Sequence, residues 1–274
     1  MSEYSIPDQP ARFAKAKVEN NTRMLATSFD LSYLSGLRVA VTGANRGIGL
    51  ALSRSIVAAG GHLVAITRAS SPELEALNPS ELISGVDVTN DKHCEELGSR
   101  ITGGPVDVLI NNAGYFYEPA ERILDGTNNY AEELKMLDIC ALGPLRVTSS
   151  LVLSGVVRAG CRVAMITSQG GSIAWRTVQN PNGGDYGHHM SKAAANMMSV
   201  LVAQELRPKG IPVVVLHPGF NKTDMTAKYA HIWEVEGAVD PAVGAQRVLH
   251  EIKLIDMERS GKFFNCEDGL MIPW

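Results

Sequence analysis

Short apolar runs recur along the chain from Leu37 onward, and longer stretches of helical character separate them. The runs are rich in β-branched residues and are apolar at consecutive positions, which is typical of parallel strands that are covered on both faces. This alternation predicts an α/β fold with one doubly wound domain. The runs lie at residues 37–42, 62–67, 84–88, 106–110, 161–167, 211–217 and 261–264.

The first 35 residues lack this alternation, so we separate an N-terminal arm, residues 1–35, from a domain at residues 36–274. Residues 11–25 are compatible with a helix, although their apolar positions form only a loose stripe. We expect the arm to lie on the domain surface or on a partner subunit, and a disordered tail is the alternative. The stripe consists of Phe13, Val18, Met24 and Leu25.

Composition and charge narrow the class of protein. Of the 274 residues, 45% are hydrophobic and 20% are charged, which is ordinary for a globular protein with a sizeable core. The formal net charge of −4 gives no electrostatic reason to expect binding to nucleic acid or to an anionic membrane. No apolar run approaches the roughly 18 residues of a membrane span, and the polar N-terminus is unlike a secretory signal.

The cysteines are scattered along the chain without a C-x-x-C pair. This spacing is typical of reduced thiols in an intracellular protein rather than of a disulfide framework or a zinc site. We therefore expect a cytoplasmic protein. The four positions are Cys94, Cys140, Cys161 and Cys266.

A glycine-rich segment, T-G-A-N-R-G-I-G at residues 42–49, lies between the first predicted strand and a predicted helix at residues 48–59. Glycines allow a tight turn and a close backbone approach, and the free N–H groups of a helix N-terminus can bind a pyrophosphate. A glycine-rich segment alone is a weak signal, but its position between a strand and a helix indicates nucleotide binding. It predicts a dinucleotide site, and a merely tight turn is the simpler alternative.

The end of the second run bears on which dinucleotide binds. An acidic residue there would accept hydrogen bonds from the ribose of NAD, whereas an arginine accommodates a 2′-phosphate. The run ends in Arg68, the glycine turn contains Arg46, and no acid is present. This favours NADP(H), although Arg68 alone would also suit an ordinary surface position.

Several further motifs follow in order, and together with the glycine turn they resemble the short-chain dehydrogenase/reductase family from about residue 36 to the C-terminus. The closing G-K-F-F-N and the long Ser-to-Lys spacing look most like its C-factor-type carbonyl reductase branch. The resemblance implies a seven-stranded parallel Rossmann sheet, a small-molecule substrate, and a homodimer or homotetramer formed through helices around residues 129–155 and 186–206. The motifs are N-N-A-G at 111–114, S-x-x-G at 168–171, S-K-A-A at 191–194, and H-P-G at 217–219 with Thr223.

The resemblance also implies roles for the matching residues. Ser168 would bind the substrate oxygen, and Lys192 would hydrogen-bond the nicotinamide ribose. The implied cofactor-binding positions are Gly43, Asn45, Arg46, Gly47, Ile48, Gly49, Arg68, Asp87, Val88, Asn111, Ala113, Gly114, Lys192, Pro218, Gly219 and Thr223.

Two of the four catalytic positions depart from the family. The family's tyrosine lies four residues before the lysine, and this position is His188; Tyr186 lies six residues before Lys192 and cannot share its helix face. The family's helix-borne asparagine corresponds to Cys140, which as a buried thiol suits inert filling better than catalysis. We expect Ser168, His188 and Lys192 to be catalytic, and a helix-start histidine without chemistry is the alternative for His188.

These residues predict an NADP(H)-dependent oxidoreductase that reduces a carbonyl or an imine of an organic metabolite. The Lys192 cation disfavours imidazolium at His188, but a neutral imidazole can still donate a hydrogen bond to a carbonyl oxygen. An iminium substrate needs no strong acid and would suit this site. The alternatives are a non-redox isomerase, cyclase or lyase on the same scaffold, and a catalytically silent NADP(H)-binding protein.

Residues around this site carry further expectations. Residues 221–236 match the family's mobile substrate lid in position. We expect His189 to be solvated or at a subunit contact. Four loop aromatics are expected on the substrate side, with ordinary packing as the alternative: Tyr115, Phe116, Tyr117 and Trp175.

Overall fold

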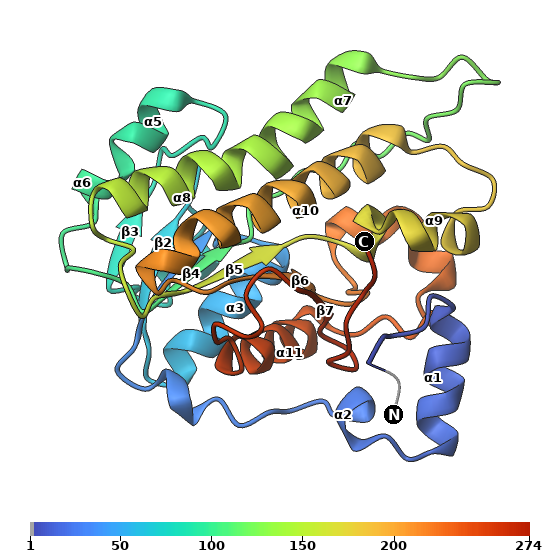
Figure 1. Ribbon diagram of the computed structural model, residues 1–274, viewed down its shortest axis with the longest axis horizontal. Helices are drawn as coiled ribbons and strands as arrows, with labels where there is room; N and C mark the ends of the chain where they lie inside the picture. The colour runs from blue at the N-terminus through green and yellow to red at the C-terminus, as the bar shows by residue number, and fades with distance from the viewer. Residues whose placement is uncertain (1–2) are drawn as a thin grey trace.

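Seven parallel strands form the sheet at the centre of the protein (Figure 1). They are β1 (Arg38–Thr42), β2 (His62–Ile66), β3 (Glu81–Ile83), β4 (Val108–Asn111), β5 (Arg162–Ile166), β6 (Val213–His217) and β7 (Phe263–Asn265). Their order across the sheet is β3-β2-β1-β4-β5-β6-β7, and every neighbouring pair is parallel. The structure, a computed structural model, describes residues 3–274 and confirms the predicted doubly wound fold.

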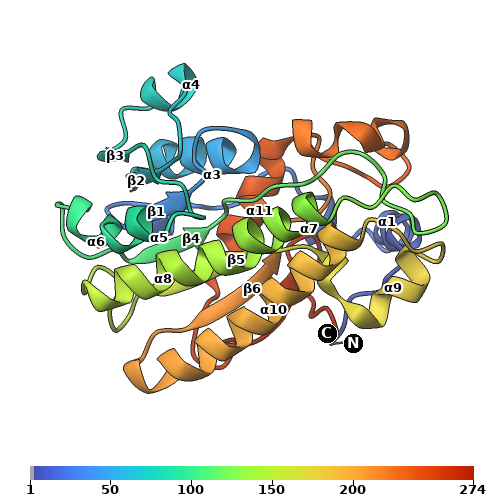
Figure 2. The same cartoon turned by 90° about the horizontal axis from the view of Figure 1, so that it is seen from above.

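Helices cover both faces of this sheet, as the view from above shows (Figure 2). The helices of the domain are α3 (Gly47–Ala58), α4 (Pro72–Glu75), α5 (Asp91–Glu95), α6 (Leu97–Arg100), α7 (Tyr130–Leu137), α8 (Gly143–Leu153), α9 (Ile173–Gln179), α10 (Tyr186–Leu206) and α11 (Pro241–Lys253). Leu52 of α3 and Leu249 of α11 pack with Val39 on one face, whereas Val147 of α8 packs with Ala40 on the other. Consecutive strand residues enter opposite cores, which explains the uninterrupted apolar runs.

The predicted boundaries agree with the structure to within about two residues, except for the third strand. That strand was predicted at residues 84–88, but β3 ends at Ile83. Gly85 has a φ of +77°, a left-handed conformation that interrupts an extended strand. Asp87 and Val88 therefore lie in the loop after β3.

The N-terminal arm packs against the C-terminal part of the domain (Figure 1). Its helices are α1 (Gln9–Val18) and α2 (Thr22–Leu25), and the N–H of Ser5 donates to the carbonyl of Met271. The expected apolar stripe is wrong for α1, because Val18 is 87% exposed while Gln9, Arg12 and Ala16 are buried. A polar buried face gives no signal in a hydrophobic pattern.

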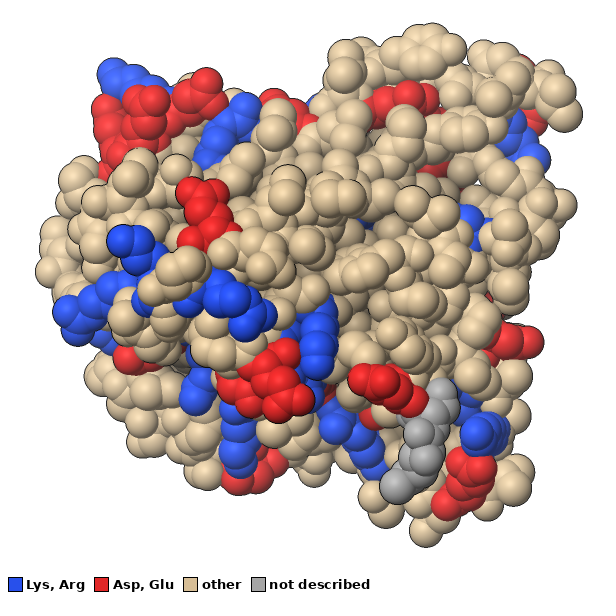
Figure 3. All heavy atoms as spheres, viewed as in Figure 1, with Lys and Arg blue, Asp and Glu red and all other residues tan. Residues whose placement is uncertain are grey.

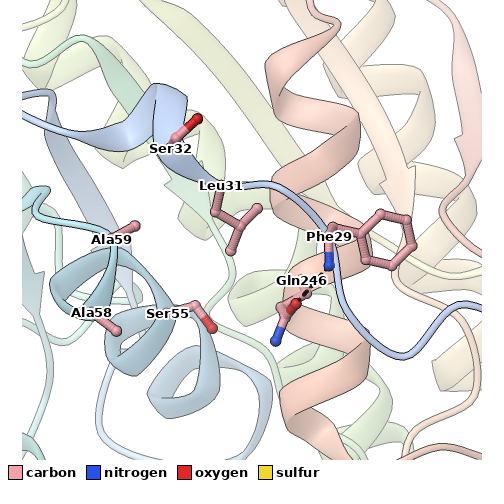
Figure 4. Close-up of a pocket in the computed structure, with 7 residues that line it drawn as sticks. All are labelled: Phe29, Leu31, Ser32, Ser55, Ala58, Ala59 and Gln246. Carbon is pink, nitrogen blue, oxygen red and sulfur yellow. Dashed lines mark hydrogen bonds between the residues drawn. The ribbon is translucent and has the colours of Figure 1, made fainter.

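Beyond α2, the chain crosses α3 and α11 before it enters the sheet. The N–H of Phe29 donates to the Gln246 side chain of α11 at 2.9 Å. A shallow hollow lies between this segment and the two helices, lined in part by Leu31 and Ser55 (Figure 4). Its lining contains no acidic, basic or thiol side chain, so it offers no catalytic group.

A continuous helical stretch, Tyr130–Leu153, consists of α7, a π-helical turn at Asp138–Leu142, and α8. Within the described residues, it is the one helix long and apolar enough to cross a membrane by length and composition. One side of it packs on α10. A core helix passes the same test, so these two properties are weak evidence for a membrane span.

Candidate active site

Four of the motifs singled out in the sequence lie at the carboxyl ends of parallel strands and so meet at one edge of the sheet. The glycine turn follows β1, the N-N-A-G loop follows β4, and the S-x-x-G segment, called here the Ser168 turn, follows β5. The H-P-G motif spans the end of β6 and the residues after it. Residues 218–220 are called the β6 loop below.

The glycine turn is shaped for a closely approaching ligand. Gly43 and Gly47 have φ values of +65° and +52°, and a Cβ on Gly49 would lie 2.0 Å from the carbonyl oxygen of Gly43. The start of α3 therefore packs against the turn more closely than any other residue would allow. The Oγ1 of Thr42 accepts hydrogen bonds from the N–H groups of Asn112 and Ala113, which fixes the turn to the N-N-A-G loop.

Asn111 points away from this turn. Its Nδ2 donates to Thr148 Oγ1 of α8 at 3.0 Å, and the side chain is buried. It therefore holds the end of β4 against α8. Gly114, in contrast, lies beside the Lys192 ammonium, because a Cβ on Gly114 would be 3.9 Å from Lys192 Nζ.

The two arginines expected near a 2′-phosphate are both exposed. Arg46 precedes the first turn of α3, and Arg68 follows β2 with its guanidinium 3.9 Å from the Asp87 carboxylate. Burial alone would raise the pKa of Asp87, but hydrogen bonds from Thr89 and the charge of Arg68 outweigh it and lower the pKa. Arg68 and Asp87 line a cleft of about 640 Å³ that extends to Leu137 and neighbouring residues.

Two glycines allow the Ser168 turn to lie directly on α10. A Cβ on Gly171 would be 2.6 Å from the carbonyl carbon of Lys192. A Cβ on Gly170 would be 2.9 Å from His188 Nε2 and 3.1 Å from Ser168 Oγ, so these two atoms flank the same point. Ser168 Oγ accepts a hydrogen bond from the N–H of Gly170 at 2.9 Å, which leaves its proton available to a ligand.

The His188 ring lies in a largely apolar and cationic environment. The Phe116 ring contacts it edge to face with centroids 4.7 Å apart, and Nδ1 has no hydrogen-bond partner among the described residues. Burial lowers the pKa of His188 well below its usual value, and the nearby Lys192 and Lys228 charges lower it further. The imidazole is therefore neutral at neutral pH, with Nε2 on the side of Ser168.

The expected solvation of His189 is wrong, whereas a subunit contact there stays a prediction. Its Nδ1 lies 2.9 Å from the carbonyl oxygen of Gly170, and its Nε2 lies 3.1 Å from Asn180 Nδ2. Nδ1 also lies 3.3 Å from the Arg176 guanidinium, which can only donate. The shorter contact with the carbonyl, which only accepts, places the proton on Nδ1, and Nε2 then accepts from the amide. Burial lowers the pKa of His189, so the neutral ring holds the Ser168 turn in place. These partners lie 9 and 19 residues before His189, outside α10, so helical spacing alone could not identify them.

Cys140 lies in the π-helical turn between α7 and α8. It is buried, and its Sγ is 3.4 Å from the carbonyl oxygen of Tyr115, to which the thiol can donate. The thiol thus faces the loop that follows N-N-A-G.

The loop aromatics divide between the site and the core. Phe116 covers His188, and Tyr115 donates its hydroxyl to Glu132 at 2.7 Å. The expectation for Trp175 was wrong, because this residue is buried in a cluster with Val215, Phe263 and Ile272. An aromatic residue in a loop fits either environment, and the C-terminal segment that covers Trp175 is remote in sequence.

The predicted lid, residues 221–236, contains a 3-10 helix at Asp224–Ile232. Lys228 Nζ donates to the carbonyl of Glu118 at 3.0 Å and lies 4.1 Å from the Phe116 ring centroid. Tyr229 donates its hydroxyl to Asp185 at 3.3 Å. The lid therefore contacts both the loop after β4 and the start of α10. Lys228 was missed from the sequence because a lysine in a polar loop has no distinguishing pattern.

Comparisons with known proteins agree with this geometry. A family model described as short chain dehydrogenase matches residues 38–232. C-signal of Myxococcus xanthus is 40% identical over 176 residues, which are 64% of this chain and 97% of that protein. A 1-hydroxy-2-glutathionyl-2-methyl-3-butene dehydrogenase of Rhodococcus sp. (strain AD45) is 30% identical over 240 residues, which are 86% of this chain and 99% of that protein.

A solved structure of NADPH-bound carbonyl reductase from chicken fatty liver is similar in fold, with a TM-score of 0.74 and 25% identity. The similarity covers 88% of this chain and 100% of that chain. The family model spans the glycine turn, the N-N-A-G loop, the Ser168 turn, α10 and the β6 loop. The chain therefore belongs to the short-chain dehydrogenase family of oxidoreductases.

Proposed function

We propose that the protein is an NADP(H)-dependent reductase of a carbonyl or imine group, in which His188 takes the place of the family's catalytic tyrosine. The observation that carries this proposal is the proximity of His188 Nε2 and Ser168 Oγ, which lie 2.9 Å and 3.1 Å from the position that a Cβ on Gly170 would take. Lys192 lies on the same helix, one turn further on. The bound nicotinamide would supply the hydride.

The cofactor fits the glycine turn and the arginines beside it. The close approach at Gly49 packs the start of α3 against the turn, and the free N–H groups at that helix start would bind a pyrophosphate. The exposed guanidiniums of Arg46 and Arg68 suit a 2′-phosphate. The NADPH bound to the chicken carbonyl reductase supports the same assignment.

Ser168 and His188 would both hydrogen-bond to the substrate. Ser168 Oγ already accepts from Gly170, so its own proton can be donated to the substrate oxygen or nitrogen. The neutral His188 ring would donate from Nε2 and polarise the substrate without being a strong acid. The Lys192 ammonium, beside Gly114, would add positive charge near the developing anion. An iminium ion would need no proton at hydride transfer, but the Lys192 and Lys228 charges oppose the binding of a cation. The site therefore favours neither a carbonyl nor an imine over the other.

Substitution at His188 tests the proposal. With purified protein, NADPH and a panel of carbonyl compounds and cyclic imines, we expect nicotinamide absorbance to fall. His188→Ala should then lower kcat/KM roughly a hundredfold, as is typical for losing a hydrogen-bond donor to the transition state. Tyr186→Phe is the matched control on the same helix turn and should change little. Equal turnover by wild type and His188→Ala would overturn the role of His188.

A non-redox reaction on the same scaffold is the second candidate, and the neutral state of His188 favours it over an ordinary reductase. Product formation without any change in nicotinamide absorbance would identify an isomerase, cyclase or lyase. A third candidate is a silent NADP(H)-binding protein. It would bind NADPH tightly without turnover, and His188→Tyr would not restore activity.

We also propose a cytoplasmic homodimer or homotetramer that binds neither nucleic acid nor membranes. The surface over α8 and α10 has few charged side chains (Figure 3). Large apolar side chains are exposed along α7, the π-helical turn, α8 and α10, and exposed apolar patches often mark subunit interfaces. They are Tyr130, Leu134, Leu142, Leu145, Leu153, Met190, Met197 and Leu201.

A further inference from the structure

A buried polar cluster lies next to the candidate site and is formed by the N-terminal arm and the C-terminal segment. Gln9 and Arg12 come from α1, and Glu267 follows β7. Gln9 and Arg12 are each 4% exposed, and Glu267 is 0% exposed. Buried polar groups of this kind need specific partners, so they fix the segments that provide those partners.

Gln9 connects three segments that surround the site. Its Oε1 accepts from Nε2 of Gln169, the residue directly after Ser168, at 3.0 Å. Its Nε2 donates to the carbonyl of Glu236 at the end of the lid at 2.9 Å, and to the Glu267 carboxylate at 3.3 Å. One amide of the arm thus holds the Ser168 turn and the lid in a common frame.

Glu267 supports the β6 loop. Its Oε1 accepts from the N–H of Phe220 at 3.2 Å, and a Cβ on Gly219 would be 2.7 Å from Glu267 Cγ. The Arg12 guanidinium pairs with the other carboxylate oxygen at 2.7 Å. Burial alone would raise the pKa of Glu267, but the charge of Arg12 outweighs it, so the carboxylate stays ionised.

We propose that the N-terminal arm positions the β6 loop and the Ser168 turn through Gln9, Arg12 and Glu267. The arm therefore helps to shape the cofactor and substrate site. This inference rests on the proposed function, because the β6 loop contains Pro218 and Gly219, which are expected to bind the proposed cofactor. The three side chains are positioning residues, since none of them reaches Ser168 Oγ or His188 directly.

The arm has a second anchor, on a buried carboxylate, which allows positioning to be separated from simple docking. Arg23 of the arm pairs with Glu251 of α11, a carboxylate that also pairs with Arg259 at 2.5 Å. Arg23→Ala therefore weakens the attachment of the arm without leaving Glu251 unpaired. No contact of Arg23 within the described residues involves the β6 loop, the Ser168 turn or the lid.

The test compares Gln9→Ala with Arg23→Ala in the full-length protein. NADPH affinity is measured by fluorescence titration, and amide hydrogen exchange is followed at Phe220 and across the lid. We expect Gln9→Ala to weaken NADPH binding roughly threefold to tenfold, as for the loss of one or two buried hydrogen bonds. It should also speed exchange at both segments, because Glu236 and the β6 loop lose support. Arg23→Ala should lower the unfolding temperature while leaving both readouts near wild type.

Unchanged affinity and exchange in Gln9→Ala would overturn the proposal, and so would identical changes in both variants. The exchange readout needs neither NADPH nor a substrate. If wild-type protein does not bind NADPH, the proposed function fails, and faster exchange in Gln9→Ala alone still supports the positioning role. If the wild-type protein binds NADPH without turnover, both NADPH affinity and amide hydrogen exchange can still be measured and still test the proposal.

Discussion

At the scale of single residues, His217 shows how burial sets the charge of a group near the site. It ends β6 directly before the β6 loop and is 5% exposed. Neither ring nitrogen has a hydrogen-bond partner among the described residues. Burial lowers the pKa of His217 to about 4, and the charge of Glu267 offsets only part of this effect. The ring is therefore neutral where the protein works.

We expect His217 to make the fold sensitive to mild acid. The unfolded chain takes up this proton near pH 6.5, whereas the folded chain resists it until about pH 4. Stability therefore falls as the pH drops from 6.5, by about 2 kcal/mol at roughly pH 5, and above 6.5 this residue adds no pH dependence. Urea unfolding of wild type and His217→Gln, at about pH 6.5 and at about pH 5, measures how much stability each protein loses. An equal loss of stability in both proteins would contradict it.

At the scale of the element, the glycine turn and α3 depend on one position without a side chain. A Cβ on Gly49 would be 2.0 Å from the Gly43 carbonyl and 2.6 Å from the Asn112 side chain. We expect Gly49→Ala to move α3 away from the turn, to lower the free energy of unfolding by about 1–3 kcal/mol, and to weaken NADPH binding severely.

Gly47→Ala is the control within the same turn. Its Cβ would meet nothing closer than 3.9 Å, so the substitution strains only the backbone, at about 1–2 kcal/mol. Thermal unfolding and NADPH titration of both variants separate steric displacement from backbone strain. A smaller effect at Gly49 than at Gly47 would show that α3 is not held by this close approach.

Helices and strands could be predicted from the sequence where their burial leaves a local pattern. The strands and α3 were found because burial on both faces leaves a local apolar pattern, and Gly60 marks the end of α3. The third strand was misplaced because the apolar pattern continues to Val88, whereas the pairing of β3 with β2 ends at Ile83, before Gly85. Local patterns do not contain the partners of Trp175 or His189, which come from the C-terminal segment and the Ser168 turn. The environments of these two residues can be identified only from the tertiary structure.

At the scale of the whole molecule, the two ends of the chain meet beside the candidate site. Met271 pairs with the start of the arm, and its N–H donates to the carbonyl of Glu3 at 3.1 Å. Arg12–Glu267 and Arg23–Glu251 then attach the arm at two buried carboxylates. The boundary at residue 35 remains a prediction, but the contacts show that the arm packs on the domain that follows it.

The apolar side chains exposed on α10 provide the last prediction. Met197 and Leu201 are 63% and 62% exposed and lie one turn apart on that helix. If α10 packs against its copy in a second subunit, Met197→Glu and Leu201→Glu together would bury charges without partners and shift the protein toward monomer. Val18→Glu, at an 87% exposed apolar position on α1, should leave the assembly unchanged. Sedimentation velocity of the three proteins measures the distribution, and a wild-type monomer at all concentrations would refute the interface.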